Sequence, residues 1–181
     1  MDHADHVALL RAGVPSATGP TTWADLGAGT GAFTLALAEL LGPGSTIHPL
    51  DRDASAVEEA TRRVRRQFAR VTVLPVIADL RDPLPFGRGS LDGVVMTNSL
   101  HVIRDPGPVL ASAIGAIRPG GRFLLVEYGT DAGNDWVPWP LAFATWRRIA
   151  GAAGLVGTRQ IGEVPSRFLG SIYAAASEVP G

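Results

Sequence analysis

Three alternate glycines near the start of the chain constrain its fold more than any other feature. They lie in residues 23–33, which read Trp-Ala-Asp-Leu-Gly-Ala-Gly-Thr-Gly-Ala-Phe. Glycine adopts positive φ angles at little steric cost, and it lets a ligand approach the backbone amides at the start of a helix. The stretch therefore predicts a strand, a tight turn and a helix, and the turn is typical of a site for a nucleotide-like cofactor.

The spacing of these glycines distinguishes between cofactors. Dinucleotide enzymes use G-x-G-x-x-G, whereas this turn is the tighter G-x-G-x-G. Asp25, two residues before the first glycine, would meet an ammonium group well and a pyrophosphate badly. Both features disfavour an NAD-dependent dehydrogenase, which remains a weaker hypothesis.

Three later apolar segments end in acidic or polar residues: Asp51, then Asp79, which Leu80 follows, and then the pair Asn98 and Ser99. Asp51 lies about twenty residues beyond the glycine turn, at the tip of the neighbouring strand. A carboxylate in the position of Asp51 accepts hydrogen bonds from ribose hydroxyls. Asp53 is the better N-cap for the helix that follows.

With these motifs the chain resembles the class I S-adenosylmethionine-dependent methyltransferases, from about residue 23 to residue 177. The resemblance implies an α/β fold: a Rossmann-like three-layer sandwich with a seven-stranded, mostly parallel sheet whose last strand pair is an antiparallel hairpin. The sequence also predicts the hairpin without reference to the family. Residues 164–167 are too short a link for a parallel crossover between strands at 157–163 and 169–177.

By this resemblance the cofactor is S-adenosylmethionine and the product is S-adenosylhomocysteine. Asp79 and Leu80 are implied to bind the adenine, and Asn98 and Ser99 the methionine portion through their backbone. The complete predicted cofactor site consists of Asp25, Gly27, Ala28, Gly29, Gly31, Asp51, Arg52, Asp79, Leu80, Asn98 and Ser99.

Two residues, Pro49 and Arg52, depart from the pattern that the resemblance implies, whereas Pro75 agrees with it. Pro49 lies in the predicted second strand and withholds a ladder hydrogen bond, which weakens the prediction for the last residues of that strand. Pro75 lies within the predicted third strand, residues 71–78, and indicates a sheet edge. Arg52 stands where many relatives in the family place an apolar residue against the adenine.

The resemblance places the methyl acceptor beside the ends of the fourth and fifth strands. We expect residues 128–146 to form a roof over it, with Trp136 and Trp139 as acceptor contacts. Phe143 and Trp146 have helical spacing, so packing of the last helix on the sheet explains them equally well. A roof this short suits a small, partly apolar acceptor.

Candidate catalytic residues lie at the same strand ends and are His101, Glu127 and Tyr128. An imidazole titrates near neutral pH and could act as a base, although a histidine that only closes the pocket is an equal alternative. The predicted function is S-adenosylmethionine-dependent methyl transfer to a small molecule, mainly by binding and aligning the two reactants. A non-catalytic sensor of the cofactor, or a partner subunit, is the alternative.

Composition limits the possible chemistry. The chain has no cysteine, and all 16 of its basic side chains are arginine, which excludes thiolate and lysine-amine catalysis. A net charge of -1 gives no general attraction to nucleic acid or acidic membranes. We expect one methyltransferase domain over residues 1–181, with a cap helix and linker in 1–20. We also expect a cytoplasmic location and no metal, nucleic-acid or membrane partner, while the oligomeric state is left open.

Overall fold

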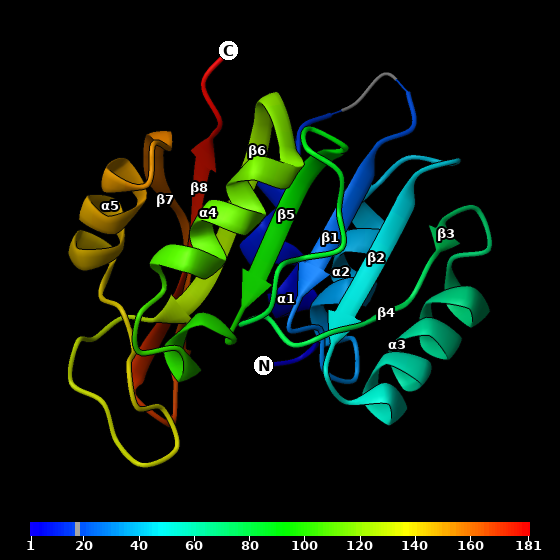
Figure 1. Cartoon of the computed structure of the whole chain (residues 1–181). Coiled ribbons are helices and arrows are strands. Elements are labelled where there is room, and N and C mark those ends of the chain that lie inside the picture. Colours follow the sequence, from blue (N-terminus) through cyan, green and yellow to red (C-terminus); the bar gives the residue numbers. More distant parts are fainter. Residues whose placement is uncertain (17–18) are drawn as a thin grey trace.

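The strands of the computed structural model, which describes residues 1–16 and 19–181, form one sheet (Figure 1). In chain order the elements are α1 (His3–Arg11), β1 (Thr22–Leu26), α2 (Ala32–Leu40), β2 (Thr46–Asp51), α3 (Ala54–Gln67), β3 (Thr72–Val73), β4 (Val76–Ile77), β5 (Leu91–Thr97), the 3₁₀ turn η1 (Leu100–Val102), α4 (Gly107–Ala116), β6 (Ile117–Tyr128), α5 (Phe143–Ala152), β7 (Val156–Ser166) and β8 (Gly170–Glu178). The sheet order is β3-β2-β1-β5-β6-β8-β7, with β4 also paired to β2. All pairs are parallel except those of β8 with β6 and β7, which confirms the predicted α/β sheet and its hairpin.

The third strand of the predicted sheet is divided. The sequence predicts one strand over residues 71–78, but the structure has β3 and β4, with Leu74 and Pro75 between them. Both pair with β2 on its outer side, so together they fill one edge position of the sheet. Proline has no N–H to donate to a neighbouring strand, which explains the break.

Pro49 is accommodated opposite the same break. The backbone oxygens of Ile47 and Asp51 accept hydrogen bonds from the amides of Leu74 and Ala78 in the edge segment. Alternate residues of a strand direct their backbone groups to the same neighbour, so Pro49 faces the interval between β3 and β4. No donor is required there. β2 therefore continues through the proline to its end, and the expected weakness of its last residues is not seen.

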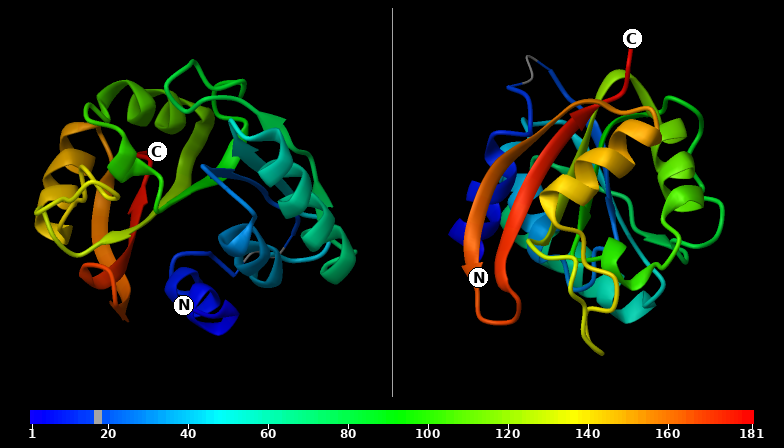
Figure 2. Two further views of the ribbon diagram at one scale, coloured as in Figure 1. Left: turned by 90° about the horizontal axis from the view of Figure 1, so that it is seen from below. Right: turned by 90° about the vertical axis from the view of Figure 1, so that its left-hand side faces the viewer.

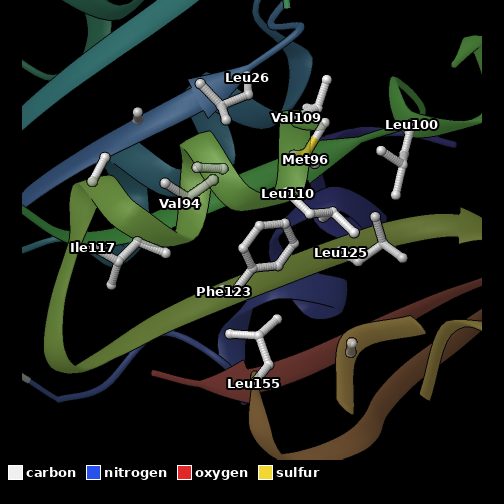
Figure 3. Packing of buried hydrophobic residues seen from close by; sticks show 14 of the residues in the cluster. Leu26, Val94, Met96, Leu100, Val109, Leu110, Ile117, Phe123, Leu125 and Leu155 are labelled. Carbon is white, nitrogen blue, oxygen red and sulfur yellow. The ribbon is translucent and has the colours of Figure 1, made fainter. Parts of the chain in front are cut away.

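Helices cover both faces of the sheet and produce the predicted three layers (Figure 2). α4 and α5 lie on one face, and α1, α2 and α3 lie on the other. In the first core, Phe123 of β6 packs with Leu110 of α4 and with Leu155 (Figure 3). Burial of this apolar surface on both faces holds the layers together and fixes the carboxyl ends of the strands at one edge.

Two aromatic residues attach α5 to the sheet. Trp146 is fully buried, with its ring 5.6 Å from that of Phe123. The ring of Phe143 lies 5.8 Å from that of Tyr173 on β8. Both residues therefore pack the last helix on the sheet. The irregular part of the predicted roof ends at residue 142, where α5 begins.

The predicted N-terminal cap corresponds to α1, which packs against α2 and β7. Its buried side chains are Val7, Leu9 and Leu10. Residues 17–18 of the predicted linker lie outside the described residues. The helices in the described ranges are each too short or too polar to cross a lipid bilayer.

Candidate functional site

The three glycines of the turn have positive φ angles of 81°, 50° and 85° at Gly27, Gly29 and Gly31. A Cβ at Gly27 would lie 2.4 Å from the Cβ of Ser99, and one at Gly31 would lie 2.6 Å from the Cβ of Ala60. A Cβ at Gly29 would meet nothing within 4 Å. Two of the glycines are thus required by packing inside the protein, whereas the middle one leaves open space that a ligand can approach.

Asp51, at the end of β2, is held beside this turn. Its Oδ2 accepts a 2.9 Å hydrogen bond from the amide of Gly29, and its Oδ1 accepts one of 3.0 Å from the amide of Asp53. Asp53 itself caps α3 by accepting from the amides of Ser55 and Ala56. The two acids therefore have the separate positions that the sequence predicts.

A cavity of about 500 Å³ opens beside the turn, within the size range of sites for small ligands. Its walls contain residues from the glycine turn and from the ends of β2, β4 and β5. The lining residues are Gly27, Asp51, Arg52, Ala78, Asp79, Leu80, Arg81, Asn98, Ser99, Val102 and Ile103. The structure thus brings seven of the predicted cofactor residues to one cavity, and Ala28, Gly29 and Gly31 belong to the adjoining turn.

Asp25 lies beneath the turn and is not one of the lining residues. Its carboxyl group is fully buried, and Oδ2 accepts a 2.6 Å hydrogen bond from Oγ1 of Thr34. Within the described structure Oδ1 has no hydrogen-bond partner. Burial raises the pKa of Asp25 to about 7, with a further contribution from the charge of Asp51. The predicted direct contact of Asp25 with a ligand's ammonium group therefore has no support in this geometry.

Asp79 is already engaged by a neighbouring side chain. Oδ1 accepts from both Nε and the amide of Arg81 at 2.9 Å, and Oδ2 accepts from an η-nitrogen of the same guanidinium at 2.5 Å. These bonds hold the pKa of Asp79 well below its usual range. Asp79 is therefore a carboxylate at all ordinary pH values, and it remains available to an adenine amino group through its other lone pairs.

His101 in η1 and Glu127 near the end of β6 form a buried pair. Nδ1 of His101 lies 2.9 Å and 3.1 Å from the two carboxylate oxygens of Glu127. The same carboxylate accepts from the backbone amides of His101, at 3.2 Å, and Tyr128, at 2.8 Å. The ring of Tyr128 lies edge-on to that of His101, 5.6 Å away. The structure thus brings the three candidate catalytic residues together.

The two tryptophans of the predicted roof differ in exposure and in surroundings. Trp136 is 79% exposed, whereas Trp139 is 46% exposed and lines a second cavity of about 820 Å³ between η1 and α5. The amide of Trp139 donates a 2.9 Å hydrogen bond to the carbonyl of His101, and Ile103 lines both cavities. This backbone hydrogen bond holds Trp139 next to His101, the candidate base, whereas the side chain of Trp136 faces solvent.

Sequence reasoning missed several residues of the site. Arg63 of α3 donates a 2.7 Å hydrogen bond to the carbonyl of Thr30 in the glycine turn. Thr34 bonds to Asp25, and Arg81 to Asp79. The contacts of Arg63 and Thr34 join residues that are brought together only when the chain folds. The contact between Arg81 and Asp79 could have been predicted, because the two residues are two positions apart in the sequence.

The described residues fit S-adenosylmethionine: two acids, Asp51 and Asp79, line the cavity as acceptors for hydroxyl and amino groups, and the backbone at Gly29 adjoins open space. A family profile described as a methyltransferase domain matches residues 24–125. The chain belongs to the class I S-adenosylmethionine-dependent methyltransferases. S-adenosylmethionine is the cofactor of this family.

Two curated relatives and one solved structure extend this result. The ubiquinone/menaquinone biosynthesis C-methyltransferase UbiE of Pasteurella multocida is 30% identical over 104 residues, which cover 58% of this chain and 38% of that protein. The reducing polyketide synthase grgA of a Penicillium species is 26% identical over 84% of this chain and 7% of its own length. The chain thus spans well under half of either relative. The carbon methyltransferase CurJ superimposes with a TM-score of 0.75 at 17% identity, covering 93% of this chain and 50% of that one, and shows the same fold.

Proposed function

We propose that this chain methylates a carbon atom of a small, partly apolar acceptor, and that His101 removes the proton from that carbon. The buried pair of His101 and Glu127 carries the proposal. Both side chains are almost inaccessible to solvent, and they lie at the strand ends where the family places its acceptor.

The contacts of Glu127 determine which nitrogen of His101 acts as the base. An ionised carboxylate only accepts hydrogen bonds, so Nδ1 carries the proton that it shares with Glu127. The neutral ring then has its lone pair on Nε2. Two backbone amides hold the carboxylate in place, and its contact with Nδ1 in turn fixes the orientation of the ring. Glu127 thereby orients the base and stabilises the imidazolium that forms when Nε2 accepts a proton.

A carbon acceptor needs such a base more than a nitrogen acceptor does. A neutral amine already has a lone pair, whereas a carbon next to a carbonyl group becomes nucleophilic only after it loses its C–H proton and the carbonyl oxygen takes up the negative charge. The ring carbon of a phenol becomes nucleophilic through its phenolate, and its C–H proton is lost after the new C–C bond has formed. The similarity to UbiE, a C-methyltransferase, supports this class of acceptor.

When bound, S-adenosylmethionine supplies a methyl group on a positively charged sulfur and leaves as the neutral thioether S-adenosylhomocysteine. His101 holds the proton taken from the acceptor, and a new C–C bond replaces the C–H bond. Burial and the charge of Glu127 raise the pKa of Tyr128, so its hydroxyl stays neutral and able to donate. We assign it to the acceptor oxygen on which negative charge develops.

Trp139 and the cavity that it lines complete the proposed acceptor site. The cavity adjoins the cofactor cavity at Ile103, and the guanidinium of Arg104 lies 5.5 Å from the Trp139 ring. The wall is largely apolar and carries the carboxylates of Asp131 and Asp135 as well as this cation, which suits a partly apolar molecule better than the polyanionic backbone of a nucleic acid. A sensor without catalysis is the competing hypothesis, and it gives no reason for a buried histidine and carboxylate pair.

Methyl transfer to a panel of acceptors tests the proposal. The panel contains a β-ketoacyl thioester, a hydroquinone and a primary amine, and mass spectrometry locates the methyl group. We expect carbon methylation that slows by about 10²- to 10⁴-fold in His101→Ala. Replacement of His3, an exposed histidine paired with Glu39, is the matched control and should leave the rate unchanged. Methylation of the amine at equal rates in His101→Ala and the parent would contradict the proposal.

A further inference from the structure

The irregular part of the roof connects the end of β6 to the start of α5 (Figure 1). It comprises residues 129–142, which form neither helix nor strand and are called the roof loop below. Connections of this length are uncommon in a compact domain, and they are usually either disordered or functional. The roof loop is ordered by hydrogen bonds of its own, which places it in the second class.

One side chain closes the two ends of the roof loop on each other. Oδ1 of Asp131 accepts a 2.9 Å hydrogen bond from the amide of Ala142, the residue directly before α5. Its Oδ2 accepts a 2.9 Å bond from Oγ1 of Thr145 in the first turn of that helix. A carboxylate is favoured at a helix N-terminus, where backbone amides lack partners. Asp131 thus supplies the side-chain cap that Ala142 itself cannot provide.

The middle of the roof loop has a second set of contacts. Oδ1 of Asn134 accepts from the amides of Trp136, at 2.9 Å, and Val137, at 2.8 Å. These bonds are local to one turn and do not depend on where the loop lies. The 2.9 Å bond from the amide of Trp139 to the carbonyl of His101 is different, because it crosses to η1. It requires the whole roof loop to lie against the site.

Asp131 is therefore linked to the acceptor site through the loop that it closes. Asp131, Thr145 and Trp139 line the same cavity. Both carboxylate oxygens of Asp131 already accept bonds from the protein, which favours an indirect role over contact with a ligand. Without these two bonds the ends of the loop could separate, and Trp139 could leave η1 and the cavity wall.

We infer that Asp131 is a positioning residue for the methyl acceptor: it closes the roof loop and thereby holds Trp139 against η1, beside His101. The inference rests on the proposed function, since it takes the cavity lined by Trp139 as the acceptor site. The link from Asp131 to the bond between Trp139 and His101 can be measured in the protein without any acceptor. That measurement is independent of which atom is methylated.

Hydrogen exchange at the amide of Trp139 in the ligand-free protein tests this link. Asp131→Ala loses both bonds to the start of α5, and we expect the Trp139 amide to exchange at least about tenfold faster. Asp131→Asn keeps an acceptor for the amide of Ala142 and places a donor beside the hydroxyl of Thr145, so it should restore the protection of the parent. Thr145→Val removes one of the two bonds and should give an intermediate rate. Unchanged exchange of Trp139 in Asp131→Ala would overturn the inference.

Asp53→Ala is the matched control, because it removes the side-chain cap of α3, which packs on β2 and β3 at the far edge of the sheet. It should lower the melting temperature about as much as Asp131→Ala does, and the amide of Trp139 should stay protected. If Asp131→Ala increased exchange in the first turn of α5 but not at Trp139, Asp131 would be a helix cap only, which contradicts the inference.

Kinetics with an acceptor that the parent methylates test the effect on binding. Only the fraction of molecules with a closed roof loop binds the acceptor well, so Asp131→Ala should raise its KM by about three- to tenfold. The kcat and the Kd for S-adenosylhomocysteine should change little, and Asp131→Asn should have the KM of the parent. Faster exchange at Trp139 with an unchanged KM would refute the positioning role. Methylation on nitrogen would refute carbon methylation instead, and it would leave the exchange result as it stands.

Discussion

Oγ1 of Thr34 donates a 2.6 Å hydrogen bond to Oδ2 of Asp25 beneath the glycine turn. The carboxyl group is fully buried, and its other oxygen has no partner in the described structure. Burial, reinforced by the charge of Asp51, raises the pKa of Asp25 to about 7 against the opposing effect of Thr34. A group that supports the cofactor turn therefore changes its protonation state near neutral pH.

We expect the folded protein to lose stability as the pH rises through about 7. Aspartate in the unfolded chain releases its proton near the ordinary value of 3.8, so between the two values the folded state holds a proton that the unfolded state has lost. The contribution of Asp25 to the free energy of unfolding is thus greatest below the lower pKa and declines above it, by up to roughly 4 kcal/mol. Urea unfolding at pH 5 and pH 8 measures it. Asp25→Asn should lack this decline, and a parent-to-variant difference that is equal at both pH values would refute it.

Alanine at Gly29 and at Gly31 should affect different properties. Both positions have positive φ, so each variant bears roughly 1–2 kcal/mol of backbone strain. At Gly31 the new methyl would also lie 2.8 Å from the Cα of Ala60, so Gly31→Ala should unfold at a clearly lower temperature. Gly29→Ala places its methyl in open space and should mainly reduce cofactor affinity. Calorimetry in the absence and presence of S-adenosylhomocysteine distinguishes them, and the reverse order would contradict our description of the turn.

Asp51 at the end of β2 and Asp53 just after it provide a matched pair of variants. Asp51→Ala removes the carboxylate next to Gly29, and we expect a loss of about 1.5–3 kcal/mol in cofactor binding. Asp53→Ala removes the cap of α3 and should cost about 1 kcal/mol of stability with cofactor affinity retained. Titration calorimetry with S-adenosylhomocysteine measures the first effect and thermal melting the second. If Asp53→Ala lost the cofactor and Asp51→Ala kept it, the two roles would be exchanged.

Trp139 and Trp136 should differ in their effect on the acceptor. Trp139 lines the second cavity and its backbone contacts His101, so Trp139→Ala should raise the KM for the acceptor and leave cofactor affinity unchanged. Trp136→Ala should also raise the KM for the acceptor, but the increase should be smaller than in Trp139→Ala because the Trp136 side chain is largely exposed. Steady-state kinetics with a carbon acceptor compares the two variants. An unchanged KM in both would place the acceptor elsewhere.

Local chemistry explains what could be predicted from the sequence. The helix cap at Asp53 and the hairpin between β7 and β8 depend on residues close together in the chain, and both predictions are confirmed. The break between β3 and β4 was not predicted, because it depends on where Pro49 and Pro75 meet across two strands. The sequence predicts which segments form strands, but it does not give the register in which neighbouring strands pair.

The candidate site shows the same division. The position of Asp51 follows from its place at a strand end, and the structure puts it beside the glycine turn. Burial of Asp25 could not be predicted, because it depends on how tightly α2 packs over β1. The pairing of His101 with Glu127 joins residues 26 positions apart, and only the parallel register of β5 and β6 brings them together.

Proton removal by His101 can be measured separately from methyl transfer. With S-adenosylhomocysteine in place of S-adenosylmethionine no methyl group can move, so a base acting on the acceptor exchanges its C–H hydrogen for deuterium from heavy water. We predict that the parent protein exchanges the hydrogen of the carbon that it methylates. His101→Ala should be at least about 100-fold slower. Absence of exchange in the parent, with an acceptor that it does methylate on carbon, would contradict the role of His101 as the base.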